Sequence, residues 1–178
     1  MPTMIVEDGS IVAGANSYGT VSDLETYWDN RNVSLSTYTT AQKEAALIIS
    51  TQYLDNNFTW KGEILSLEQP LDWPRTGVYD EQGRNVEQTE IPFQLTNALF
   101  EYAYRQLTNS DGLQPDVTDL GTLKKKAINL DGGISISKEY EDKTGGYFGI
   151  RSYPLADNWL KGLTTGGTMG DFGRVRRC

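Results

Sequence analysis

The sequence predicts a mainly α-helical protein: a small helical bundle with a β-hairpin, a long aromatic-anchored loop, and extended N- and C-terminal arms. Apolar residues recur every three or four positions over residues 40–57 and 91–108, which is the period of an amphipathic helix. Large aromatics scattered among glycines and prolines over residues 58–90 indicate the loop, and alternation within residues 121–141 indicates the hairpin. We therefore expect one domain, residues 1–163.

The N-terminal arm, residues 1–21, has few apolar side chains, and we expect it to be mobile until the protein assembles. Ser22 is a typical N-cap residue, and Glu25 three positions later matches the capping-box spacing. A short helix is therefore expected from Ser22 to about Asn30. Its apolar side is formed by Leu24, Tyr27 and Trp28.

The clearest helix is predicted over residues 40–57, where Thr39 and Gln42 repeat the capping-box spacing. Its end is marked by Asp55-Asn56-Asn57, residue types that prefer caps and turns. We expect its buried stripe to contain Ala45, Ala46, Ile48, Ile49, Tyr53 and Leu54.

Two further helices are expected. Ile91-Pro92 starts a helix that continues to about residue 108, because proline suits the first helical turn. A short final helix is predicted over residues 154–163. The apolar side of the first of these two helices contains Leu95, Ala98, Leu99, Tyr102, Ala103 and Leu107.

The long loop is expected to fold back on the end of the helix at residues 40–57. Its two tryptophans, Trp60 and Trp73, need partners for their area and for their indole N–H groups. We favour a structural staple over a ligand cage, and Arg75 would serve it by a fork to a carboxylate or by stacking on Trp73. The predicted staple consists of Tyr53, Leu54, Trp60, Trp73 and Arg75. A short hairpin within the loop would turn at Asp80–Gly83.

The β-hairpin is predicted from strands at residues 122–130 and 134–140 around Asp131-Gly132-Gly133. Its lysines could bind nucleic acid, but regular alternation would place Lys124 and Lys126 on one side and Lys125 on the other. Protection of an exposed strand edge is the favoured interpretation. Residues that could contact a neighbouring subunit through this hairpin are Lys124, Lys125, Lys126, Ile134 and Ile136.

Composition excludes several kinds of site. The chain has no histidine, which excludes a Ser-His-Asp triad and a His-ligated zinc site. Its one cysteine, Cys178, cannot form an internal disulfide. Carboxylates such as Glu87 and Glu90 are better explained as solvated surface charges than as a glycosidase pair. We therefore predict no enzymatic activity, no catalytic residue, no metal and no cofactor.

The sequence also bears on compartment and partners. The N-terminal residues lack the basic and apolar regions of a signal peptide, and no apolar run approaches 18 residues. We expect a soluble protein that acts in a reducing compartment without a membrane. The net charge of −8 should repel a polyanion such as DNA.

Seven short segments, taken together and in order, resemble a known family. They are Glu7–Ser10, Gly14–Tyr18, Lys43–Leu47, Tyr53-Leu54, Trp60–Gly62, Gln69–Val78 with its Trp73-Pro74-Arg75 core, and Ile91-Pro92. They are similar to the small head–tail connector proteins of tailed bacteriophages, also called adaptor or head-completion proteins. This family is often labelled DnaT-like single-stranded DNA-binding. The resemblance covers roughly residues 5–160.

The resemblance implies a mainly helical subunit of a homo-oligomeric ring, typically of twelve copies, beneath the portal protein. Such a ring prolongs the channel through which duplex DNA passes without tight binding, and it seats the next neck or tail protein. The protein would then lie in the neck of the virion, and in the host cytoplasm during assembly. The alternative is a module that binds single-stranded DNA, which should present a basic face.

The C-terminal tail, residues 164–178, is rich in glycine and is expected to be flexible. Its last residues are basic although the whole chain is acidic. One interpretation is a plug that docks into an acidic pocket of the portal, and the other is a solvated tail that raises solubility. The residues predicted to contact the portal are Arg174, Val175, Arg176 and Arg177.

Overall fold

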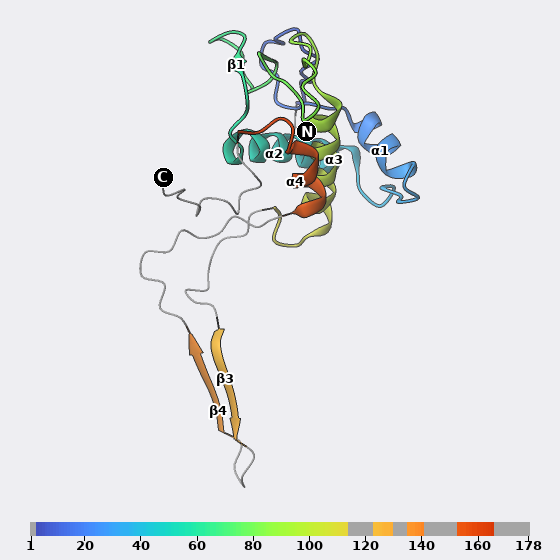
Figure 1. Cartoon of the computed structure of the whole chain (residues 1–178). Coiled ribbons are helices and arrows are strands. Elements are labelled where there is room, and N and C mark those ends of the chain that lie inside the picture. The colour runs from blue at the N-terminus through green and yellow to red at the C-terminus, as the bar shows by residue number, and fades with distance from the viewer. Residues whose placement is uncertain (1–2, 114–122, 130–134, 141–152, 166–178) are drawn as a thin grey trace, which may run out of the picture. The chain divides into compact units, whose positions relative to one another are not determined.

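The computed structural model describes residues 3–113, 123–129, 135–140 and 153–165 (Figure 1). The chain divides into two compact units. The helical unit comprises residues 1–113 and 151–178, and the hairpin unit comprises residues 114–150. The fold is mainly helical with a small hairpin, which confirms the predicted fold class.

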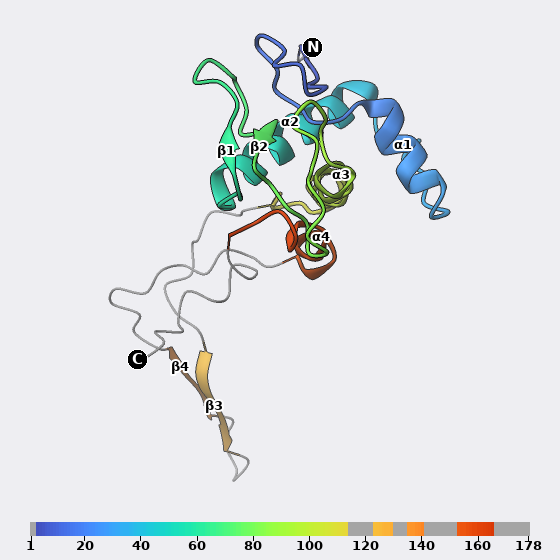
Figure 2. The same ribbon diagram turned by 45° about the horizontal axis from the view of Figure 1, so that its top comes forward.

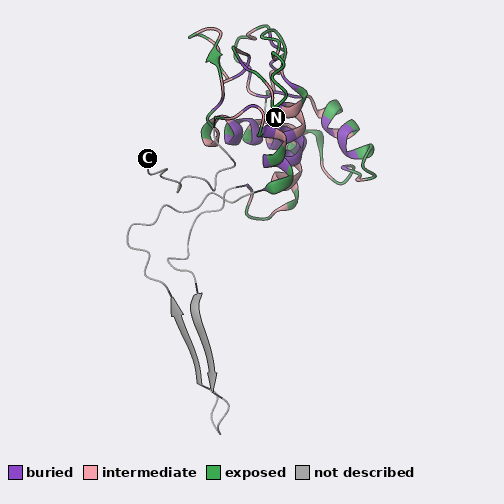
Figure 3. Ribbon diagram, viewed as in Figure 1, coloured by how far each residue is buried: buried purple, intermediate pink, exposed green. Residues whose placement is uncertain are grey.

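The helical unit is arranged around α3 (Phe93–Thr108), which packs against three other helices. These are α1 (Val21–Asp29), α2 (Thr40–Asn57) and α4 (Pro154–Leu160). Figure 2 shows α3 almost end-on among its neighbours, and Figure 3 shows that the buried residues gather where the helices meet. The final helix ends three residues earlier than predicted.

The cap of α1 differs from the prediction. Thr20 is the N-cap, and its hydroxyl accepts a hydrogen bond from the Asp23 backbone N–H at 3.1 Å. Ser22 lies inside the helix, because the helix begins one residue before it. The predicted apolar side is confirmed, since Leu24, Tyr27 and Trp28 are buried.

The cap of α2 is confirmed, and its predicted buried face is confirmed in part. Thr39 and Gln42 form the reciprocal hydrogen bonds of a capping box. Three residues of the predicted stripe, Ala46, Tyr53 and Leu54, are buried, whereas Ile49 remains 40% exposed. Polar residues complete the buried face, among them Lys43, which forms an ion pair with Glu25 at 2.6 Å. The buried residues of α2 are Lys43, Ala46, Leu47, Ser50, Thr51, Tyr53 and Leu54.

Hydrogen bonds of two tyrosines hold α4 and its flanks to α3. The Tyr102 hydroxyl donates to Asp157, and the Tyr153 backbone N–H donates to the other oxygen of that carboxylate at 3.0 Å. The Tyr153 hydroxyl donates to the Leu113 carbonyl at 2.6 Å. Residues 113 and 153, which flank the hairpin unit, are therefore joined within the helical unit.

The N-terminal arm is packed within the single chain, contrary to its expected mobility. Glu7 is 1% exposed, and its carboxylate accepts the backbone N–H groups of Gly9, Ile11 and Val12 at 2.9–3.0 Å. The arm reaches order through one buried carboxylate and Tyr18, not through a large apolar area. Sequence patterns based on apolar periodicity do not detect such an anchor.

The loop at residues 58–90 contains a small two-stranded sheet, in which β1 (Glu63–Ile64) pairs antiparallel with β2 (Arg75–Thr76). The turn predicted at Asp80–Gly83 is present. Tyr79 and Asn85 form an antiparallel β-bridge on either side of it, and the Gly83 N–H donates to the Asp80 carbonyl at 3.0 Å. The loop is thus irregular but ordered.

The hairpin unit contains β3 (Leu123–Asn129) and β4 (Ser135–Tyr140), which pair antiparallel. The register shifts between Leu123 and Lys125, so the regular alternation expected for the three lysines is interrupted at Lys124. The predicted turn at Asp131–Gly133 and Ile134 lie outside the described residues.

Candidate functional site

The predicted staple residues come together in the core of the helical unit. Tyr53, Leu54, Trp60 and Trp73 all belong to one buried apolar cluster, and Trp73 is 0% exposed. The rings of Trp60 and Trp73 meet edge to face, with centroids 5.8 Å apart. The loop is therefore fixed to the helices by large aromatic burial, and these tryptophans form no open cage.

The indole groups differ from the prediction in one respect. Neither Trp60 Nε1 nor Trp73 Nε1 has a hydrogen-bond partner within the described part of the chain. An unpaired buried donor carries a desolvation cost. The two rings are retained by their apolar area and ring contact, which outweigh that cost.

Arg75 closes the loop on itself through backbone oxygens. Its Nε donates to the Lys61 carbonyl at 2.8 Å, its Nη2 to Gly62 at 2.9 Å and its Nη1 to Asp72 at 3.1 Å. Arg75 is thus a structural residue, but its partners are carbonyls, not the carboxylate or the Trp73 ring considered from sequence. Sequence spacing does not indicate these carbonyl partners, since they converge only after the loop folds.

A second anchor of the loop, absent from the sequence prediction, is Asp55 at the end of α2. Its carboxylate accepts the Tyr18 hydroxyl at 2.7 Å and the Asp72 N–H at 3.3 Å. The Trp73 N–H in turn donates to the Tyr18 hydroxyl at 3.2 Å. Burial raises the pKa of Asp55 to about 7, and the nearby Asp72 charge adds to that rise. The arm, α2 and the loop meet at this carboxyl group.

The tip of the loop, Glu63–Glu68, is largely exposed, and its backbone is held by hydrogen bonds to Gln69. The Gln69 side-chain Oε1 accepts the N–H groups of Leu65 and Ser66 at 3.0 and 3.1 Å. Its Nε2 donates to the carbonyls of Leu71 and Pro74 at 2.7 and 3.2 Å. We call this segment the loop tip.

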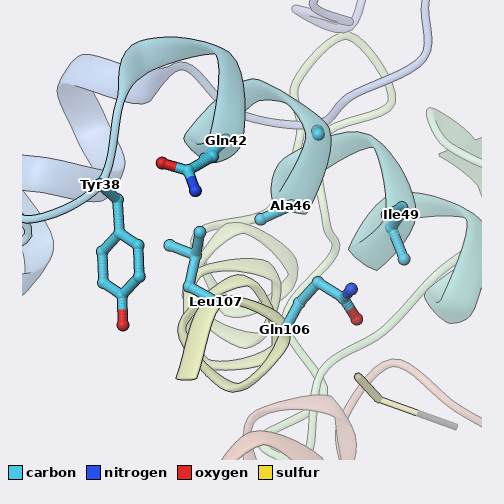
Figure 4. A pocket seen from close by; sticks show the side chains of 7 residues that line it. Tyr38, Gln42, Ala46, Ile49, Gln106 and Leu107 are labelled. Carbon is cyan, nitrogen blue, oxygen red and sulfur yellow. The ribbon is translucent and has the colours of Figure 1, made fainter. Parts of the chain in front are cut away.

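A shallow recess lies between α2 and the end of α3 (Figure 4). Its volume is about 210 Å³, and no charged side chain lines it. Its chemistry suits an apolar side chain and gives no anchor for an anion. The lining residues are Tyr38, Gln42, Ala45, Ala46, Ile49, Gln106 and Leu107.

Charge is unevenly distributed along the chain. Residues 3–113 and 153–165 contain 7 Lys and Arg against 17 Asp and Glu, a net charge of −10. The rest of the chain contains 9 Lys and Arg against 7 Asp and Glu, a net charge of +2. The two values sum to the −8 of the whole chain.

Most cations of the acidic helical part are bound internally. Six of its seven Lys and Arg side chains donate to a protein carboxylate or carbonyl, and Lys161 is exposed. A basic groove able to follow a phosphate backbone is therefore absent from residues 3–113 and 153–165. The six are Arg31, Lys43, Lys61, Arg75, Arg84 and Arg105.

The remaining predicted site residues lie elsewhere. Lys124, Lys125, Lys126 and Ile136 belong to the paired strands of the hairpin unit. The tail residues predicted to contact the portal, Arg174, Val175, Arg176 and Arg177, lie outside the described residues, as does Ile134. Among the described residues, no three Asp, Glu or Cys side chains gather as a metal site would require, and no helix has the length and apolarity to cross a membrane.

Comparison with known proteins gives one match. A family model described as "Putative DnaT-like ssDNA binding protein" matches residues 2–178. The chain belongs to this DnaT-like family. The match confirms the family label to which the seven ordered segments pointed, and it also covers the C-terminal residues that the resemblance left out. No curated protein and no solved structure matches the chain.

Proposed function

We propose that this DnaT-like protein is a non-enzymatic structural subunit, the head–tail adaptor of a tailed phage. Copies of the chain form a ring beneath the portal protein, extend the DNA channel and seat the next neck or tail protein. The proposal places it in the virion neck, and in the host cytoplasm during assembly. It rests on the family resemblance of the ordered segments.

The observation that favours an adaptor is the charge of the helical unit. Its described part has a net charge of −10, and six of its seven cations are bound to the protein itself. An acidic wall repels phosphates, so duplex DNA can pass beside it without being gripped. In this proposal the basic tail, with Arg174, Val175, Arg176 and Arg177, docks on the portal.

The second candidate is a module that binds single-stranded DNA, which the family description favours. Such binding would have to use the hairpin unit or the tail, because half of the lysines and arginines lie there and six of the seven cations in the described helical part are bound to the protein itself. Aromatic stacking and a basic track would then have to come from the same segments.

Electron microscopy and DNA titration decide between the two. The purified chain, alone and mixed with its portal protein, should give closed rings with a central channel in electron micrographs. Fluorescence anisotropy with labelled single-stranded and duplex DNA should show weak binding that vanishes at physiological salt. Submicromolar affinity for single-stranded DNA at that salt, without rings, would overturn the adaptor proposal in favour of the binding module.

A further inference from the structure

The loop tip exposes a leucine, Leu67, next to backbone that is held by hydrogen bonds. Leu67 is 94% exposed and Ile64 is 39% exposed. Isolated exposed leucines are common, but this one directly follows Leu65 and Ser66, whose backbone N–H groups both donate to the Gln69 side chain. A preorganised segment loses little conformational entropy when it docks, so such a tip is suited to a binding contact.

The loop tip is also acidic. Glu63 and Glu68 flank its three apolar residues, and both glutamates are exposed. Neither carboxylate forms a salt bridge within the described part of the chain. The tip therefore offers an apolar centre between two negative charges, and a basic partner with apolar residues would complement it.

The hairpin unit carries that complementary chemistry. Its two strands contain four lysines and one glutamate, a net charge of +3, whereas the whole unit, residues 114–150, has five lysines against six Asp and Glu. The register places Ile128 opposite Ile136 and Lys126 opposite Lys138, and directly opposed residues share one face of a hairpin. The pairing of like charges is unfavourable, and a two-stranded hairpin is marginally stable by itself. An acidic, apolar partner would relieve both weaknesses.

We propose that the loop tip of one copy docks on the face of a second copy's hairpin that carries Ile128 and Ile136. Leu67 packs on the isoleucines, while Glu63 and Glu68 neutralise hairpin lysines. The contact joins two different surfaces, which is the head-to-tail arrangement from which rings are built. This inference rests on the proposed ring and names the surfaces that hold it together. DNA is the less favoured occupant of the hairpin, because three net charges give few phosphate contacts.

Exposed leucines allow a matched test on the full chain. Mass photometry over a concentration series measures the concentration at which rings of the wild-type protein form. Leu67→Ser should raise that concentration roughly tenfold or more, as expected for the loss of a central interface anchor. The control Leu155→Ser removes another exposed leucine, 65% exposed on α4, and should leave assembly unchanged. Thermal melts should show that both variants fold.

A charge exchange tests the pairing itself. Glu63→Lys with Glu68→Lys, or Lys126→Glu with Lys138→Glu on the face that carries the two isoleucines, should each prevent ring formation, and the chain with all four changes should regain it. Arg174→Glu with Arg176→Glu is the control for the lysine reversal, because it lowers the net charge by the same amount in the tail. It should leave rings intact. Normal assembly of the Leu67 variant, or no recovery in the four-fold variant, overturns this docking. Hairpin reversals that abolish only DNA binding also overturn it, whereas a wild-type chain that never forms rings contradicts the proposed adaptor itself.

Discussion

Single buried groups tie the irregular parts of this protein to its helices. Glu7 collects three backbone N–H groups of the arm, and Asp55 joins the arm to the loop through Tyr18 and Asp72. Both are carboxyl groups buried in a small domain, where a polar group is stable only with such hydrogen-bond partners. Their roles were invisible in the sequence, because the N–H groups that they bind come from non-periodic segments.

Asp55 makes stability depend on pH. Its folded-state pKa of about 7 lies above the ordinary value of 3.8, so the folded chain holds a proton that the unfolded chain has released. The stability is fully present below about pH 4 and is lost as the pH rises through about 7. We expect the free energy of unfolding, measured by urea titration, to fall by roughly 2–3 kcal/mol between pH 5 and pH 8.

The variant Asp55→Asn should flatten this pH dependence, because an amide does not titrate. Its stability at any one pH is less informative, since the amide can also disturb the Asp72 N–H bond. Asp111→Asn, at an exposed carboxyl group, is the control and should keep the wild-type slope. An unchanged slope in Asp55→Asn would assign the pH dependence to other groups.

Trp73 is the second residue whose loss should be felt throughout the fold. The side chain is 0% exposed, so Trp73→Ala should cost on the order of 3–5 kcal/mol, as large aromatic truncations in cores do. Thermal denaturation followed by circular dichroism measures the loss. Phe93→Ala, at a ring that is 61% exposed, should cost far less. If Trp73→Ala kept full stability but failed to assemble, Trp73 would belong to an interface.

At the scale of elements, the helices were predictable and their orientation was only partly so. The capping box at Thr39 and Gln42 was predictable because it is a local pattern. The buried face of α2 was predictable only in part. Ala46, Tyr53 and Leu54 are buried as expected. Lys43 is buried by its ion pair with Glu25, however, while Ile49 stays exposed. Apolar periodicity reports which face prefers burial, and tertiary partners decide which face is buried.

Two glycines of the loop provide a matched test of its tight closure. Both Gly62 and Gly77 have positive φ angles, of 68° and 71°. A Cβ atom on Gly62 would lie 2.1 Å from the Thr76 carbonyl oxygen, whereas one on Gly77 would meet nothing within 4 Å. Gly77→Ala should therefore cost about 1 kcal/mol from backbone strain alone.

Gly62→Ala should cost clearly more, because it must also displace β2 from β1. Melting temperatures of the two variants, recorded under one set of conditions, give the comparison. Equal decreases in melting temperature would mean that the backbone at Gly62 moves easily to accept a Cβ atom. The loop tip would then hold Leu67 less rigidly than its hydrogen bonds indicate.

At the scale of the whole molecule, charge separates the described helical part from the rest of the chain. The net charge of the sequence was known at once, but only the structure shows which charges belong to the packed helices and loop, where they sum to −10. The same holds for the tail. Thr165 donates its N–H to the Thr59 carbonyl at 2.9 Å, so the fold extends two residues into the segment that was expected to be free.

Truncation after Thr165 tests the role of the tail. Removal of residues 166–178 keeps the bond between Thr165 and Thr59, and the shortened chain should melt at the wild-type temperature. We expect it to lose binding to the portal in a pull-down or by surface plasmon resonance. Portal binding at wild-type strength would leave the tail as a solubilising segment.

The hydrogen bond between Tyr153 and Leu113 has a consequence for how this chain can vary. It holds together the two points at which the intervening 39 residues leave and rejoin the helical unit. An insertion with closed ends can be lengthened, exchanged or excised at small thermodynamic cost, because closure entropy grows only slowly with loop length. A chain in which a short glycine linker replaces residues 114–152 should therefore fold. The helical unit should therefore accept different inserted segments between residues 113 and 153, which would give subunits with different neighbours.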